Sequence, residues 1–178
     1  NETGDYIDFT ETDGCNSQAQ QCLQGEFASF EKTMLVKLPT QTLDLSGKKY
    51  RLMFMAMHLQ GGGSNTINLS ASQFNTYLTA SSNTAGTVTG TFSELEMPAG
   101  LGSDLTSMAD VVNAEAFTMS LAANGATTIT VGNSNSDHTV LEGFFNSDGS
   151  LGVFTTGYVE AGGDRDELGL AVLIDVSQ

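Results

Sequence analysis

The amino-acid sequence predicts an all-β protein: an antiparallel meander that closes into an up-and-down barrel of eight or nine strands. Three observations predict this class: short alternating apolar segments divided by turns, two hairpin signals at Asn124–Gly125 and Asp148–Gly149, and only two prolines with little helical periodicity among 178 residues. Closure is favoured because it removes the unpaired edges of the sheet. A two-sheet β-sandwich is the runner-up.

The first half of the chain provides strands with clear ends. Pro39 ends the first one, and the glycine-rich stretch 60–65 closes the second. In the third, the alternation slips near Gln73 and Phe74, as it does at a β-bulge or a break. These expected strands are, in chain order, 27–38, 49–59, 66–79 and 86–97.

The second half begins with an irregular stretch after Pro98. Ser103 or Asp104 can cap a short helix, which we expect over 103–113 because apolar residues follow at helical spacing. Asn-Gly and Asp-Gly turns then predict two hairpins, and an apolar run predicts a final buried strand. These elements are expected over 116–133, 139–159 and 168–176.

The charge of the chain is strongly negative. Twenty-one acidic residues stand against six basic ones, a net charge of -15. Nucleic acids and anionic membranes are therefore poor partners, because both select for lysine and arginine. No apolar run reaches the ~20 residues of a membrane helix, so we expect no direct membrane insertion. An acidic, lysine-poor surface is typical of secreted, periplasmic or cell-surface proteins, and the first residues resemble a trimmed mature terminus.

The two cysteines lie in a segment ahead of the expected barrel. Six residues separate Cys15 from Cys22, a spacing that can close a small loop. In an exported protein a disulfide is the favoured interpretation, and a metal site is less favoured because it would need further ligands nearby. We expect residues 1–25 to form an N-terminal arm with this disulfide and residues 26–178 to form the barrel domain.

A row of methionines in the second expected strand raises the question of a soft-metal site. Met53, Met55 and Met57 alternate with Phe54, Ala56 and His58, which places the thioethers about 6.6–6.8 Å apart on one face. Thioethers suit Cu(I), but His58 belongs to the opposite row, so a core or pocket lining is favoured. The candidate ligand-binding residues inside the barrel are Met53, Met55, Met57, Phe117, Met119 and Phe144. If the other row faces inward, Phe54 and His58 replace the methionines.

Two polar segments are weak calcium candidates. Oxygen ligands alternate at Asn133, Asn135 and Asp137, and carboxylates recur at Asp164 and Asp166. Neither segment supplies the distal bidentate glutamate of a calcium loop, and Asx turns or a solvated acidic loop explain both without an ion. The sequence also lacks a nucleophile elbow and a phosphate-binding glycine loop. We therefore expect no enzyme, no cofactor and no bound metal.

Three stretches together resemble lipocalin-like (calycin) barrels, in particular small secreted bacterial ones. They are "LSGKKYRLMFMAMHL" as the opening strand and "TMSLAANGATTITV" and "EGFFNSDGSLGVF" as successive hairpins, within about residues 45–176. Lipocalins carry Gly-x-Trp in the opening strand, where this chain has "GKKY" from Gly47 to Tyr50 and no tryptophan. The resemblance implies a cup-shaped barrel that holds one apolar ligand.

Two functions of different kinds follow from these features. The first is a non-enzymatic exported β-barrel that binds an apolar or amphipathic small molecule. The alternative is a structural subunit of an extracellular fibre or surface layer, which self-associates or joins neighbouring surface proteins through its N-terminal arm by adding a strand to a sheet edge.

Overall fold

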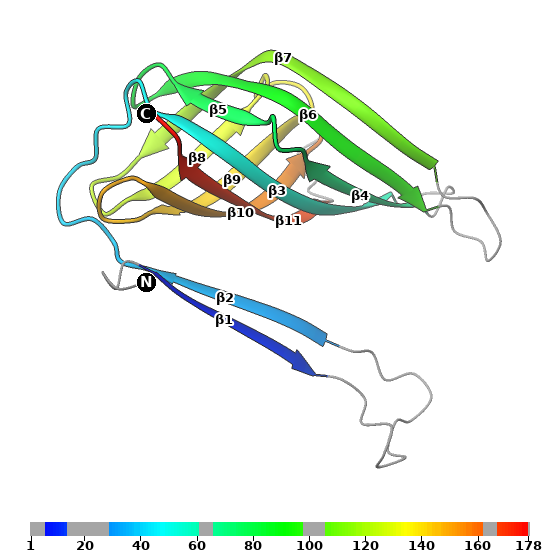
Figure 1. The fold of residues 1–178 in the computed structure, drawn as a ribbon. Coiled ribbons are helices and arrows are strands. Elements are labelled where there is room, and N and C mark those ends of the chain that lie inside the picture. Colours follow the sequence, from blue (N-terminus) through cyan, green and yellow to red (C-terminus); the bar gives the residue numbers. More distant parts are fainter. Residues whose placement is uncertain (1–5, 14–28, 61–65, 98–105, 162–166, 178) are drawn as a thin grey trace. The chain divides into compact units, whose positions relative to one another are not determined.

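The computed structural model describes residues 6–13, 29–60, 66–97, 106–161 and 167–177 (Figure 1). The chain divides into two units, Asn1–Lys37 and Leu38–Gln178. In the first, β1 (Tyr6–Asp13) pairs antiparallel with β2 (Ser29–Val36) as a separate two-stranded sheet. The stretch expected to open the barrel at 27–38 thus pairs with the arm instead, and the boundary lies after Lys37 rather than after residue 25.

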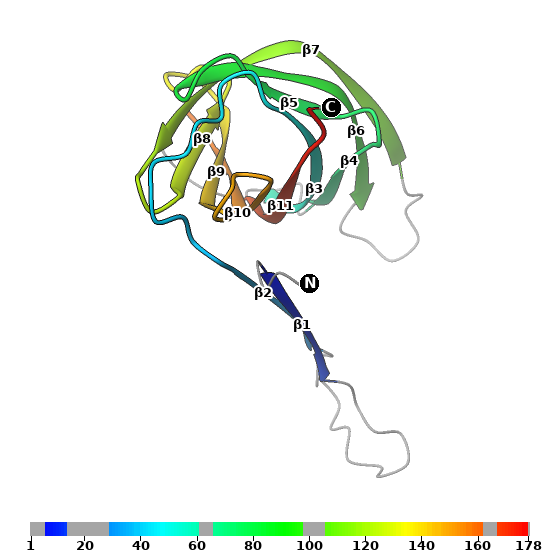
Figure 2. The same ribbon diagram turned by 60° about the vertical axis from the view of Figure 1, so that its left-hand side comes forward.

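The second unit is a closed antiparallel up-and-down barrel, which confirms the predicted fold class. Its strands run in sequence around a ring (Figure 2), and β11 pairs with β3 to close it. β4 and β5 both lie between β3 and β6 and occupy one strand position of the ring. The nine strands of this sheet therefore form a barrel with eight strand positions. The strands are β3 (Lys49–Gln60), β4 (Thr66–Ser72), β5 (Tyr77–Ala80), β6 (Ala85–Met97), β7 (Thr106–Leu121), β8 (Ala126–Val131), β9 (His138–Phe145), β10 (Leu151–Val159) and β11 (Glu167–Asp175).

The slip predicted near Gln73–Phe74 is confirmed as the break between β4 and β5. A tight turn forms there, in which the Thr76 amide donates to the Gln73 carbonyl at 3.0 Å. The neighbouring β6 shifts register between Val88 and Gly90. Gly90 has φ +136°, and a Cβ there would lie 2.4 Å from the Thr76 Cα, so the two irregularities fit against each other only with glycine.

The helix predicted over 103–113 is wrong for the residues that the structure describes. Residues from Thr106 onward belong to β7, which pairs with β6 from Thr106 opposite Glu96 to Val112 opposite Gly90. The adjacent Val111 and Val112 are β-branched and favour a strand, and pairing with β6 outweighs the helical spacing of a few apolar residues. The described residues contain no helix that could span a membrane.

One end of the barrel, which we call the closed end, is densely packed. Leu43 and Leu45, from the segment before β3, are buried there with a cluster of aromatic rings. Tyr50 lies 5.3 Å from Phe145, and Phe145 lies 5.4 Å from Phe154, between ring centroids. The Tyr50 hydroxyl donates to the Gly149 carbonyl at 2.8 Å, which satisfies a buried polar group. This end is therefore filled by the protein's own side chains.

The basic cluster of the sequence also lies at the closed end. Lys48 forms a 2.8 Å ion pair with Asp175, the last residue of β11. The Lys49 ammonium lies 4.1 Å from the centre of the Tyr77 ring, and Arg51 contacts the same side chain. The Lys48 ion pair thus ties the start of β3 to the end of β11, where the barrel closes, and the two contacts with Tyr77 tie β3 to β5.

Candidate functional site

Burial along β3 decides which of its two rows faces the barrel interior. Leu52 and Ala56 are 4% and 3% exposed, whereas Met53 and Met55 are 53% and 65% exposed. Met57 is also exposed, so the expectation that the methionines line the interior is wrong. The alternative row, with Phe54, faces inward. The sheet thus separates the thioethers from His58, and they do not form a common copper site with it.

The interior is hollow at the opposite end of the barrel, which we call the open end. A cavity of about 360 Å³ extends inward from this end and is lined by residues of β3, β4 and β6 to β11. Phe54 and Phe92 form an edge-to-face pair in its wall, with ring centroids 5.7 Å apart. The other apolar lining residues are Leu52, Val88, Val112, Val131 and Leu141. This volume falls within the ~300–1,000 Å³ typical of small-molecule sites.

Polar groups of the cavity are mainly acidic. Five carboxylates line it, and they come from β6, β7, the turn before β9, and β11. These are Glu94, Asp110, Glu115, Asp137 and Glu167. The inward row of β3 also carries His58, whose ring lies 5.8 Å from that of Tyr158, a further lining residue. The site therefore combines an apolar interior with a negatively charged mouth.

Comparison of the chain with protein-family models, with curated proteins and with solved structures gives no significant match. The barrel is compatible with a lipocalin-like architecture, and its cavity and charge distribution are the observations that bear on function.

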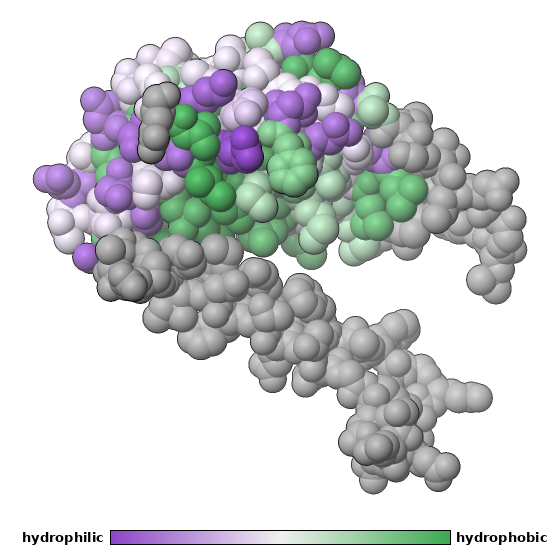
Figure 3. Space-filling model, viewed as in Figure 1, coloured by the Kyte–Doolittle hydropathy of each residue, from purple (hydrophilic) through white to green (hydrophobic). Residues whose placement is uncertain are grey.

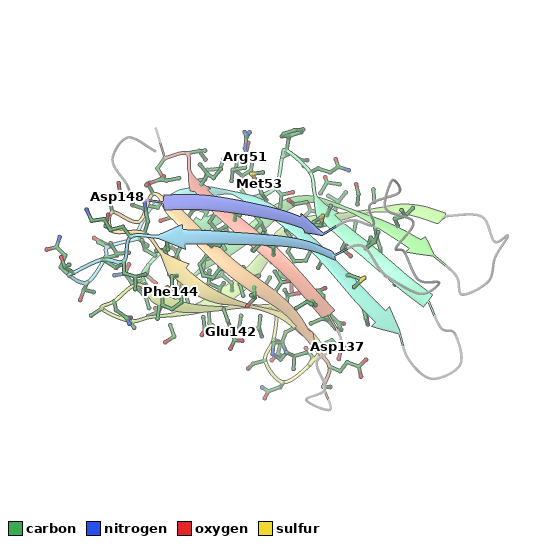
Figure 4. All side chains as sticks on the ribbon, turned by 90° about the horizontal axis from the view of Figure 1, so that it is seen from below. Arg51, Met53, Asp137, Glu142, Phe144 and Asp148 are labelled. Atoms are coloured by element: carbon green, nitrogen blue, oxygen red, sulfur yellow. The ribbon has the colours of Figure 1, made fainter. Side chains whose placement is uncertain are left out.

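The remaining predicted ligand-binding residues separate into two locations. Phe117 and Met119 face inward but are buried in the packed core, where neither lines the cavity. Phe144 lies on the outward row of β9 and is 41% exposed (Figure 4). Its neighbour Phe145 takes the inward position and is fully buried. Phe54 is thus the predicted ligand-binding residue that the structure places in the cavity wall.

The exposed methionines belong to an apolar surface on the outside of the barrel. Met53, Met55 and Met57 pair in register with Val172, Leu170 and Leu168 of β11. Figure 3 shows apolar residues gathered on this face over β3 and β11. Both rows of β3 are apolar because one contacts the interior and the other forms this surface.

The calcium candidates that the structure describes are used as turn residues. The Asn133 side chain accepts a hydrogen bond from the Asn135 amide at 3.0 Å, an Asx turn. Asp137 accepts from the Ala161 amide at 2.9 Å and so joins two connections at the open end. Asp164 and Asp166 lie outside the described residues, as do Cys15 and Cys22 with their predicted disulfide.

Sequence reasoning misses most of the cavity wall because single-strand patterns do not show which row faces inward. These patterns place Val112 in the helix expected over 103–113, and they do not show that Val131 and Glu94 face the cavity. The strand register identifies these residues. Residues that lie opposite each other on neighbouring strands point to the same face of the sheet, so placing Leu52 inside the barrel fixes the inward row of every other strand.

Proposed function

We propose that the protein is a non-enzymatic, lipocalin-like barrel that binds one apolar or amphipathic small molecule at its open end. The observation that carries this proposal is the contrast between the two halves of the interior. One half is packed by aromatic and aliphatic side chains, while the other encloses a cavity of about 360 Å³. Protein interiors are normally filled to crystal-like density, so an apolar cavity of this size is typical of a ligand site.

The architecture suits this role. Eight-stranded barrels are wide enough either to be filled by side chains or to hold one small ligand, and this barrel combines both in separate halves. Phe54 and Phe92 offer apolar ring surface to a ligand, and the carboxylates at the mouth offer polar contacts. An exported location, secreted, periplasmic or at the cell surface, is part of the proposal and is supported by the net charge of -15.

Two adjacent valines allow a matched test of the cavity. Val112 lines it, whereas Val111 points outward and is 60% exposed. We expect the neutral apolar dye Nile red to bind the wild-type protein, and Val112→Phe, which fills the cavity, to weaken binding by about tenfold or more. Val111→Phe adds the same ring on the outside and should bind like wild type. Equal dye affinity of all three proteins in a fluorescence titration would contradict the proposal, because the dye would then occupy the outer surface.

Native mass spectrometry of protein isolated from its source provides a second test. We expect a co-purifying small molecule at one copy per chain, released by unfolding. Empty protein that also fails to bind the dye would argue against a binding role.

The fibre or surface-layer role is retained as a second proposal because of one observation. Within the unit Asn1–Lys37, β1 and β2 form a two-stranded sheet of their own, and such a sheet is marginally stable in isolation. Adding strands from a neighbouring molecule would stabilise it. Size-exclusion chromatography of the full chain and of residues 38–178 tests this. Oligomers of the full chain alone are expected, and monomers in both cases would exclude the role.

A further inference from the structure

Charge is segregated along the barrel. The basic residues Lys48, Lys49 and Arg51 lie at the closed end, each in contact with an acidic or aromatic partner. The opposite end carries the cavity and its five carboxylates. In Figure 4, Asp148 and Asp137 mark these two ends. Lys32 and Lys37 belong to the first unit, and Arg165 lies outside the described residues.

Three of the cavity carboxylates have no basic partner in the described part of the barrel. No described lysine or arginine lines the cavity, and no ion pair there involves Glu94, Asp110 or Glu115. Phe92 lies opposite Asp110 across the β6–β7 pair, which places apolar and acidic side chains next to each other on the inward face. Like charges around a partly apolar concavity focus a negative potential into it.

The buried side-chain amide of Asn68 independently indicates that a ligand would carry a hydrogen-bond donor. Asn68 is 9% exposed, and its Oδ1 has no hydrogen-bond partner in the described structure. It lies opposite His58 in register and two residues before Ser70 on the inward row of β4; Ser70 lines the cavity, and Asn68 lies next to that lining residue without lining the cavity itself. A buried acceptor without a donor costs free energy, so such groups normally meet a partner. An N–H group of a ligand would supply one.

The arrangement fits an organic cation better than a metal ion. Within the described ranges, no group of three histidine, cysteine, aspartate or glutamate side chains converges closely enough to hold a metal. The carboxylates are instead distributed around the mouth, from β6 through β7 to β11. A spread of negative charge above apolar walls suits a cation whose charge lies at the end of an apolar body, and the Tyr158 ring offers a cation–π surface.

We propose that the cavity selects cationic amphiphiles: small amines whose apolar body enters among Phe54, Phe92 and Val112 while the ammonium group remains among the carboxylates of the mouth. This inference rests on the proposed binding function and adds the chemical class of the ligand. The ammonium group would donate to a carboxylate of the mouth, and the apolar body would contact the walls.

A series of three ligands with one alkyl body tests the charge preference. Octylammonium, octanol and octanoate are titrated against the full chain at pH 7 by displacement of Nile red and by calorimetry. We expect octylammonium to bind about tenfold more tightly than octanol, and octanoate most weakly, because each nearby carboxylate contributes a factor of roughly two to five. Salt should reduce the preference for octylammonium but not the octanol affinity.

Matched variants locate the preference. Glu94→Gln with Asp110→Asn removes two charges from the mouth, and we expect it to reduce the preference for octylammonium over octanol to about threefold or less. Glu142→Gln removes a charge from the outward row of β9 and serves as the control, with the preference of wild type (Figure 4). Circular dichroism and urea unfolding confirm that each variant is folded.

The outcomes separate this inference from the proposed function. If none of the three ligands binds and Nile red is not displaced, the binding function itself fails. If octanol and octylammonium bind equally, or octanoate binds most tightly, the barrel binds ligands but the inference of a cation is overturned. It is also overturned if Glu142→Gln reduces the preference as much as the double variant does, since the overall charge of the protein would then be responsible.

Discussion

Gly152 tests whether the closed end is as fully packed as its geometry indicates. This residue faces inward on β10, opposite Phe145 in register. A Cβ at this position would lie 2.6 Å from the Phe154 ring and 2.9 Å from the Phe145 ring. Both rings are buried, they pack edge to face at 77°, and Phe145 also contacts Tyr50, so neither has space to retreat. Gly152→Ala should therefore strain the aromatic cluster.

The size of the effect follows from two opposing contributions. Overpacking a buried site costs about 1–3 kcal/mol, while replacing glycine with alanine stabilises by roughly 0.4–1 kcal/mol through the unfolded chain. We expect a net loss of about 1–2 kcal/mol in the free energy of unfolding. With an m-value near ~2 kcal/mol/M, the urea midpoint should fall by about 0.5–1 M. Nile red affinity should stay at the wild-type value, because the cavity lies at the other end of the barrel.

A double-mutant cycle checks the mechanism. Phe154→Leu provides room beside position 152, so Gly152→Ala should cost less in that background, with a coupling of about 0.5 kcal/mol or more. A Gly152→Ala protein as stable as wild type would refute the reasoning. If the free-energy changes of Gly152→Ala and Phe154→Leu simply add, the Phe154 ring does not clash with the new methyl group. If Gly152→Ala also weakens Nile red binding, the packed end and the cavity are not independent.

Three further predictions concern the barrel seam, the core and the outer surface. Partial burial raises the pKa of Asp175, but hydrogen bonds from Lys48 and Ser177 outweigh it and hold the pKa below its usual value. This stabilisation is present above about pH 4, the pKa of an aspartate in the unfolded chain, and it is lost as the pH falls. Asp175→Asn should therefore lower the free energy of unfolding by about 0.5–1 kcal/mol at pH 7. Below about pH 5 the Tm of this variant should decrease less steeply than that of the wild type. Phe117→Ala should cost about 3–5 kcal/mol in urea unfolding, because a fully buried ring is removed. Serine at the three outward methionines of β3 should change stability by less than about 1 kcal/mol each and leave Nile red affinity unchanged, and a loss of binding would place the dye site outside the barrel. The substituted residues are Met53, Met55 and Met57.

The barrel was predictable from the sequence because its strands carry strong local signals. Gly125 and Gly149 have positive φ, as the Asn-Gly and Asp-Gly hairpin turns require. The break near Gln73 was also visible as lost alternation. The inward row of β3 was not predictable, because both of its rows are apolar and only pairing around the ring identifies the interior. The helix expected over 103–113 failed for a related reason: helical spacing over so few residues has little weight against long-range pairing with β6.

The separation of the barrel into a packed half and a hollow half indicates how this protein can hold a cavity and remain stable. A cavity of about 360 Å³ that stayed empty and dry would be destabilising, because its lining residues would lose packing contacts. The acidic mouth favours hydration instead, since carboxylates bind water strongly. A ligand would then displace water from apolar walls, and its binding should show a negative heat-capacity change. The apolar walls would thus provide affinity, and the carboxylates at the mouth would provide selectivity for a cation. Mutations in the walls should weaken the binding of both octanol and octylammonium, whereas mutations of the carboxylates should weaken that of octylammonium alone.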